Sequence, residues 1–124
     1  MVHLTIRYCI MTVGFSLCML SCYYDVEEEI YPYLNCETDM MSYQSDILPI
    51  LQSNCYRCHG AANNFGNITL EGYEKVRNYV NSGQLIGAIK REPGFSPMPK
   101  DRAQLLLCNI EKIEAWIADG APNN

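Results

Sequence analysis

Three residues of one short segment have side chains that can do chemistry together: Cys55, Cys58 and His59, in the order C-x-x-C-H. This order is the attachment pattern of a c-type haem. Two thiols three residues apart can each form a thioether with one of the two haem vinyl groups, and the next residue then presents its imidazole to the iron from the same side. The segment therefore predicts one covalent haem c, attached through Cys55 and Cys58, with His59 as an axial iron ligand.

Two other kinds of site use the same residue types, and chance is a third explanation. A C-x-x-C pair can be a redox dithiol, but that site is expected within a βαβ pattern, and no alternating strand pattern surrounds these cysteines. A zinc site needs four ligands, commonly with a second Cys or His pair at short spacing. Cys36 and Cys108 could contribute only as distant single ligands. We therefore favour the haem.

The N-terminal segment has the features of an export signal. Arg7 supplies a positive charge, residues 8–20 form a short uncharged apolar stretch, and the sequence becomes acidic after Cys22. The residues Met19-Leu20-Ser21-Cys22 resemble a bacterial lipobox, which implies that residues 1–21 are a lipoprotein-type signal peptide and that Cys22 is lipidated. Several acyl chains on one residue would make such a membrane anchor stable. An uncleaved anchor helix and an ordinary signal cut elsewhere are the alternatives.

Removal of this leader would limit the choice of a second axial ligand. His59 would be the one remaining histidine, so ligation by two histidines of the chain is excluded. Met98 is the best candidate, because the prolines on both sides stiffen its segment in an extended geometry, and because it lies 39 residues after His59. Met40 and Met41 precede the attachment site in a polar segment. The alternative is that Met98 is only a packed apolar residue.

The remaining cysteines predict a disulfide. Of the seven cysteines, two lie in the predicted leader, one is the predicted anchor and two are the predicted haem thiols, which leaves Cys36 and Cys108. Outside the reducing cytoplasm these two are expected to form a disulfide. It would close a loop of about 72 residues, which is worth roughly 4 kcal/mol by chain entropy. Two free thiols are the alternative, and other pairings are disfavoured only if the haem is attached.

Composition and charge limit the class of protein and of partner. With 19% charged and 48% hydrophobic residues the 124-residue chain is not disordered. After leader removal the chain would have 14 acidic and 8 basic residues, which gives a net charge of −6. This balance argues against nucleic-acid binding. It favours redox partner proteins with basic docking patches, in encounters that weaken with salt.

Residues 22–42 are predicted to be an acidic tether between the anchor and the domain. The run at 24–29 contains four acidic residues and is expected to be a solvated spacer. It also resembles the acidic run that follows the lipidated cysteine in some surface lipoproteins of the Bacteroidetes, where it is a signal for transfer to the outer face.

The elements that must position the chemical residues are predicted to be helices within a domain over residues 43–124. Apolar spacing and breakers predict four of them, over residues 45–58, 71–81, 85–90 and 109–119. Ser45 and Asn109 are the expected N-caps of the first and last helices. A small, polar, glycine-containing stretch at 61–67 is expected to be a loop.

An apolar helix leading into C-x-x-C-H, a Pro-Met-Pro loop and a closing helix with a tryptophan together resemble a class I-type cytochrome c domain, over about residues 40–121. Four segments are similar to small cytochrome c domains of Bacteroidetes and Planctomycetes: 47–51, 85–89, 94–99 and 116–122. The resemblance implies an all-α fold of about four helices around one covalent haem. It also implies that the first and last helices cross and that His59 and Met98 are the axial iron ligands.

The predicted function is that of a monohaem c-type cytochrome, a one-electron carrier outside the cytoplasm rather than an enzyme with its own substrate. Ligation by His and Met raises the reduction potential of haem iron, and two filled axial positions leave no open site. The lipid anchor predicts a location in the periplasm or at the outer surface of a bacterial cell. The alternatives are a haem-based peroxidase or ligand-sensing module with a labile sixth ligand, and a binding module in which haem is chiefly structural.

Substitution Cys22→Ser is expected to release the protein from membranes, because it removes the thiol that would carry the lipid. The measurement is the distribution of the protein between membrane and soluble fractions of the producing cells. Unchanged fractionation would refute lipidation at this residue.

Overall fold

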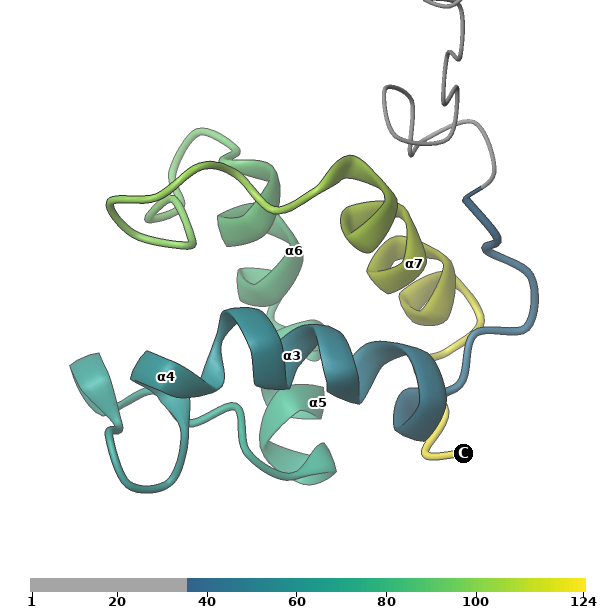
Figure 1. Ribbon diagram of the computed structural model, residues 1–124, viewed down its shortest axis with the longest axis horizontal. Coiled ribbons are helices and arrows are strands. Elements are labelled where there is room, and N and C mark those ends of the chain that lie inside the picture. The colour runs from purple at the N-terminus through teal and green to yellow at the C-terminus, as the bar shows by residue number, and fades with distance from the viewer. Residues whose placement is uncertain (1–35) are drawn as a thin grey trace, which may run out of the picture. The chain divides into compact units, whose positions relative to one another are not determined.

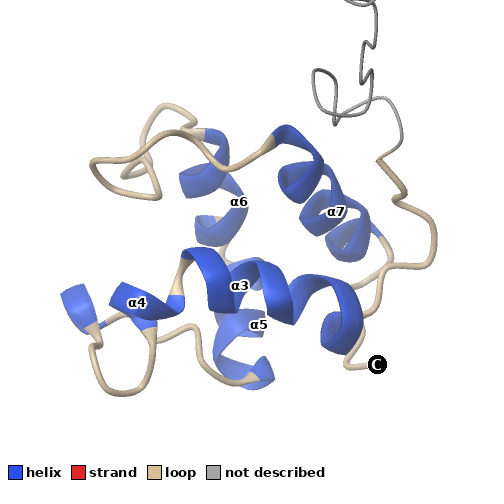
Figure 2. Cartoon of the chain, viewed as in Figure 1, coloured by secondary structure: helices blue, strands red, loops and turns tan. Residues whose placement is uncertain are grey.

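The computed structural model describes residues 36–124, and all regular structure in this range is helical (Figure 2). The lack of strands over the described range confirms the predicted all-α class. The elements in chain order are η1 (Tyr43–Ile47), α3 (Leu48–Asn54), α4 (Tyr56–His59), η2 (Phe65–Asn67), α5 (Tyr73–Asn81), α6 (Gln84–Lys90) and α7 (Leu107–Ala118) (Figure 1).

The first helical segment is capped by a different serine from the predicted one. The Ser42 hydroxyl accepts a hydrogen bond from the Ser45 N–H at 3.3 Å, and the Asp46 carboxylate accepts one from the Ser42 N–H at 2.9 Å. This reciprocal arrangement satisfies two backbone donors in the manner of a capping box. The segment therefore begins at Tyr43, and the prediction that Ser45 is the N-cap is wrong.

The helix predicted over residues 45–58 is interrupted twice. Pro49 has no N–H to donate, so a regular α-helical ladder cannot run through it. The turn before it is π-helical, with the Ile47 N–H donating to the Ser42 carbonyl at 3.1 Å. The second interruption is at Cys55, which lies between α3 and α4 with φ of −118°. The C-x-x-C-H segment thus starts at a break and continues on a new helix.

The later helices agree with the predicted ones except at their N-terminal ends. Helix α5 begins after Gly72, whose φ of 100° favours glycine, and Gly83 separates α5 from α6 in a left-handed conformation. Helix α7 begins at Leu107, so Asn109 lies inside its first turn and is not the N-cap. The first hydrogen bond of this helix runs from the Ile110 N–H to the carbonyl of Leu106, the residue that precedes the helix, at 3.2 Å.

Aromatic contacts join helical segments that are far apart in the sequence. Trp116 is fully buried, and its indole N–H donates to the Pro122 carbonyl at 2.9 Å. Tyr43 packs against Trp116 with ring centroids 5.6 Å apart and meets Tyr73 edge to face at 5.1 Å. Each such pair adds about 0.5–1.5 kcal/mol to the burial of its rings. The start of the domain is thereby fastened to α5 and α7.

Aliphatic side chains fill the rest of the core. Helix α7 contacts η1 and α6, and α6 contacts α5, so the first and last helical segments of the described chain meet. The buried aliphatic residues of the helices and their connections are Met41, Ile47, Ile50, Leu51, Leu70, Val76, Leu85, Ile89, Leu105, Ile110 and Ile113. No polar or charged residue of the described range is buried with them.

The predicted disulfide is confirmed. Cys36 and Cys108 are bonded, with Cα atoms 5.5 Å apart and a sequence separation of 72 residues. The bridge ties the end of the predicted tether to the first turn of α7. Met41, only 6% exposed, is part of the core, so residues 36–42 are attached to the helical domain both covalently and by packing.

The predicted signal peptide, the lipidation site Cys22 and the tether up to residue 35 lie outside the described residues. Among residues 36–124, none of the helices has the length and apolar character needed to cross a membrane.

Substitution Tyr43→Phe is expected to reduce the loss of stability at high pH. The Tyr43 hydroxyl is buried without a hydrogen-bond partner in the described range, and burial, together with the nearby Tyr56 hydroxyl, raises its pKa to about 12. The Tyr56 hydroxyl raises this pKa although the two groups do not meet in hydrogen-bonding geometry. In the unfolded chain a tyrosine ionises near pH 10, so the stability that the neutral hydroxyl contributes is lost as the pH rises from about 10 to about 12.

Denaturant unfolding at several pH values from about 8 to about 12 measures this effect. The Tyr43→Phe protein should lose less free energy of unfolding over this range than the parent. Tyr79→Phe, at a half-buried position on α5, is the matched control. Equal losses in all three proteins would contradict the burial of the Tyr43 hydroxyl.

Replacement of both bridge cysteines, Cys36→Ser with Cys108→Ser, is expected to lower the free energy of unfolding by roughly 4 kcal/mol. The reason is that the bridge restricts a loop of 72 residues in the unfolded chain. Denaturant unfolding compares the double variant with the parent, and the parent with its bridge reduced is the control, which should unfold at the midpoint of the double variant. Equal midpoints of the parent and the double variant would show that the bridge does not contribute.

Candidate functional site

A single turn of helix holds the C-x-x-C-H segment together. The N–H groups of Cys58 and His59 both donate to the Cys55 carbonyl, at 3.0 and 2.8 Å, and the Gly60 N–H donates to the Tyr56 carbonyl at 2.9 Å. Cys55 begins this turn and His59 is the last residue of α4. The turn thus places two thiols and one imidazole within five consecutive residues of fixed backbone.

Both thiols of the segment are free and half-buried. Burial and, to a smaller extent, the neighbouring Cys58 raise the pKa of the Cys55 thiol to about 11. Cys55 is therefore a protonated thiol at neutral pH. Catalytic dithiols have the opposite property, a lowered pKa that supplies a thiolate.

The imidazole of His59 is oriented by the backbone of a later segment. Its Nδ1 lies 3.3 Å from the Ile68 carbonyl oxygen. A carbonyl can only accept, so this hydrogen bond requires a proton on Nδ1, and in the neutral ring with that tautomer the lone pair is on Nε2. The segment that contains Ile68 also contacts the backbone of His59, because the Leu70 N–H donates to the His59 carbonyl at 2.7 Å. His59 is thus fixed in the tautomer and orientation that suit a metal ligand.

The turn after His59 is closely packed. A Cβ at Gly60 would lie 2.7 Å from the Tyr56 carbonyl oxygen, so a larger residue there would force the turn to shift. The Ala61 N–H donates to the Glu71 carboxylate at 2.7 Å. Sequence analysis did not identify Glu71 or Ile68 as part of the site, because these contacts join residues about ten apart through a loop and have no local pattern.

The second predicted ligand, Met98, lies in the loop between α6 and α7. Its N–H donates to the Ala88 carbonyl at 3.0 Å, which ties the loop to the end of α6. The Phe95 ring covers Gly87, where an added Cβ would lie 2.5 Å from a ring carbon. Gly87 therefore permits the close approach of the loop to the helix.

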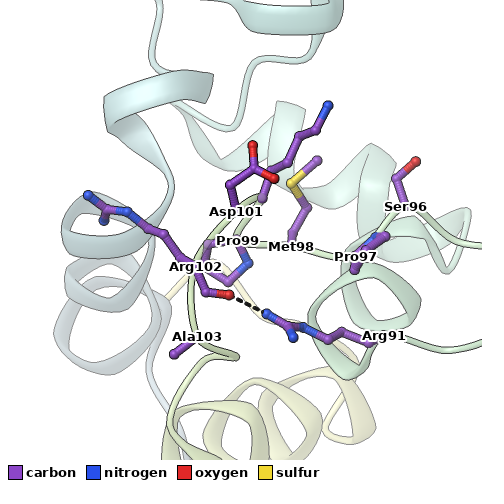
Figure 3. Close-up of a pocket in the computed structure, with 9 residues that line it drawn as sticks. Arg91, Ser96, Pro97, Met98, Pro99, Asp101, Arg102 and Ala103 are labelled. Atoms are coloured by element: carbon purple, nitrogen blue, oxygen red, sulfur yellow. Dashed lines mark hydrogen bonds between the residues drawn. The ribbon is translucent and has the colours of Figure 1, made fainter.

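A pocket of about 620 Å³ surrounds Met98 within this loop. Figure 3 shows the Met98 and Asp101 side chains on one side of the loop, and the hydrogen bond from Arg91 to the Arg102 carbonyl on the other. The residues that line the pocket are Arg91, Ser96, Pro97, Met98, Pro99, Lys100, Asp101, Arg102 and Ala103. Three of these are cationic and one is anionic, so the surface beside Met98 is positive although the chain as a whole is acidic.

The structure places the predicted site residues in three separate groups. Cys55, Cys58 and His59 lie on the α4 turn, Met98 lies on the loop after α6, and the disulfide lies at the start of α7. In Figure 1 the α4 turn and the loop after α6 both lie at the left of the view. The other two methionines considered are elsewhere: Met40 is 90% exposed and Met41 is in the core.

The zinc alternative for the C-x-x-C-H segment is not supported by the geometry. Cys36 and Cys108 are consumed by the disulfide. Over residues 36–124, no three His, Cys, Asp or Glu side chains are placed to hold one metal ion. The dithiol alternative lacks the strands of a βαβ unit within this range, and burial raises rather than lowers the pKa of Cys55.

Comparison of the chain with protein-family models, curated proteins and solved structures gives no match. Evidence on function therefore comes from the chemistry and geometry of the chain's own residues.

Proposed function

We propose that the chain is a monohaem c-type cytochrome that carries single electrons outside the cytoplasm. The observation that carries the proposal is the state of the C-x-x-C-H turn: two free thiols on one turn of helix, followed by a histidine whose Nδ1 is bound to a carbonyl and whose Nε2 is available. This donor set fits covalent haem attachment and iron ligation.

Each residue has a defined role in this proposal. Cys55 and Cys58 would form the two thioethers from one turn of helix. His59 would supply Nε2 to the iron, and the Ile68 carbonyl, which holds the ring through Nδ1, would increase its basicity. Met98 would supply the second ligand from the loop after α6.

Electron transfer without further chemistry follows from filled axial positions. When bound, the haem supplies an iron that alternates between two oxidation states. With His59 and Met98 both holding the iron, no position would be left for a substrate, and ligation by the Met98 sulfur would raise the reduction potential. Covalent attachment to the α4 turn would keep the group at a fixed position.

The anchor and the partners belong to the same proposal. Cys22, outside the described residues, would carry the lipid, and the acidic segment after it would act as the spacer. Six of the chain's 14 acidic residues lie in the predicted tether at 22–42, four of them in the run at 24–29. Partners with basic docking patches fit this charge, and their encounters should weaken with salt. The cationic surface beside Met98 would instead meet acidic groups.

One observation favours a second candidate, a peroxidase or ligand-sensing site with a labile sixth ligand. Met98 is half-buried and lines a pocket whose other residues include two arginines. A small ligand that enters this pocket would approach the thioether directly. The electron carrier requires that Met98 remain bound, whereas the second candidate requires that it leave.

Substitution Met98→Ala is expected to abolish the Met-to-iron charge-transfer band of the oxidised protein, to lower the midpoint potential and to open the iron to cyanide. Absorption spectroscopy and redox titration measure these changes. Met40→Ala, at a position that is 90% exposed, is the matched control and should behave like the parent.

Two results would contradict the proposal in different ways. If a correctly matured sample lacked haem absorption, the chain would carry no haem, and every role derived from the haem would be contradicted. A coloured parent protein that is high-spin and readily binds cyanide or carbon monoxide would replace the electron carrier by the second candidate.

A further inference from the structure

The loop that carries Met98 is fastened to α6 by two hydrogen bonds to the last carbonyls of that helix. The Met98 N–H donates to the Ala88 carbonyl at 3.0 Å, and the Gln104 side-chain amide donates to the Ile89 carbonyl at 3.0 Å. Both carbonyls lie in the last turn of α6. The Ala88 carbonyl also accepts the Arg91 N–H at 3.2 Å, so the end of the helix and the loop share this acceptor. Residues 99–103 lie between these two attachments.

A third hydrogen bond closes the loop on itself. The Arg91 guanidinium donates through Nη2 to the Arg102 carbonyl at 2.6 Å, across 11 positions of sequence (Figure 3). Arg91 is the residue that ends α6, and its φ of 60° turns the chain out of the helix. Within the described part of the chain, this is the hydrogen bond that holds residues 99–103 between the two attachments.

We propose that Arg91 is a positioning residue for Met98, and that its bond to the Arg102 carbonyl keeps the loop closed so that the thioether stays in place. This inference rests on the proposed function, because it assigns to Arg91 the retention of the second axial ligand. The guanidinium is suited to this task because it is always charged and its donors are held in a rigid plane.

The geometry separates the effect of the bond from the effect of charge. Arg91 and Arg102 both line the pocket around Met98 and both are exposed, so removal of either takes one positive charge from the same surface. Only removal of Arg91 breaks the bond, since Arg102 contributes its backbone carbonyl. Arg102→Ala is therefore a matched control for Arg91→Ala.

The experiment measures how fast imidazole, which is neutral at alkaline pH, replaces Met98 on the oxidised full-length protein. Arg91→Ala should accelerate imidazole binding by about tenfold, the factor expected from loss of one charge-assisted hydrogen bond. Arg102→Ala should bind imidazole at the rate of the parent. The rate of Arg91→Lys should lie between the rates of the parent and of Arg91→Ala. Hydrogen exchange of the Met98 amide gives a second readout that needs no ligand, and it should be faster in Arg91→Ala alone.

The outcomes distinguish failure of this inference from failure of the proposed function. Equal acceleration in Arg91→Ala and Arg102→Ala would assign the effect to charge and overturn the inference. An unchanged rate of imidazole binding in Arg91→Ala would also overturn the inference, whether or not exchange of the Met98 amide becomes faster. If instead Met98→Ala leaves the spectrum of the parent unaltered, Met98 is not a ligand and the proposed function itself is overturned.

Discussion

The position of the C-x-x-C-H turn depends on contacts from outside the turn. Helix α4 has four residues, far fewer than an isolated helix needs for stability in water. It is held between α3 before it and the 68–71 segment after it, through the hydrogen bonds of Leu70 and Ile68 to His59. These bonds fix both the backbone and the imidazole. Without the later segment the two thiols and the imidazole would keep their order in the sequence but not their relation in space.

The domain supports this turn with a small core and one covalent bond. A domain of this size buries a modest apolar area, and the aromatic group of Tyr43, Tyr73 and Trp116 supplies much of it. The bond from Cys36 to Cys108 encloses both the α4 turn and the Met98 loop. The two candidate ligand regions are therefore parts of one constrained loop of chain, although they belong to different elements.

Features that depend on neighbouring residues could be predicted from the sequence. The helical class, the separation of the helices predicted over residues 71–81 and 85–90, and the pairing of Cys36 with Cys108 follow from local pattern or cysteine count, and all are confirmed. Ser45 and Ser42 are equally good caps by residue type, and the reciprocal bond with Asp46 decided between them.

Contacts between distant segments could not be predicted in this way. The Ile68 carbonyl and the Arg102 carbonyl are backbone groups, and any residue at those positions presents the same atom. The pattern at residues 55–59 predicts which side chains form the candidate site but not what orients them. The haem and its protein family, predicted from that pattern and from the resemblance, remain proposals.

The high pKa of Cys55 has a consequence for disulfide exchange. Thiol–disulfide exchange proceeds through the thiolate, so the raised pKa of the half-buried Cys55 thiol disfavours its attack on the bridge between Cys36 and Cys108. The same burial lowers the thiolate fraction of Cys55 in the folded chain below that of an exposed cysteine.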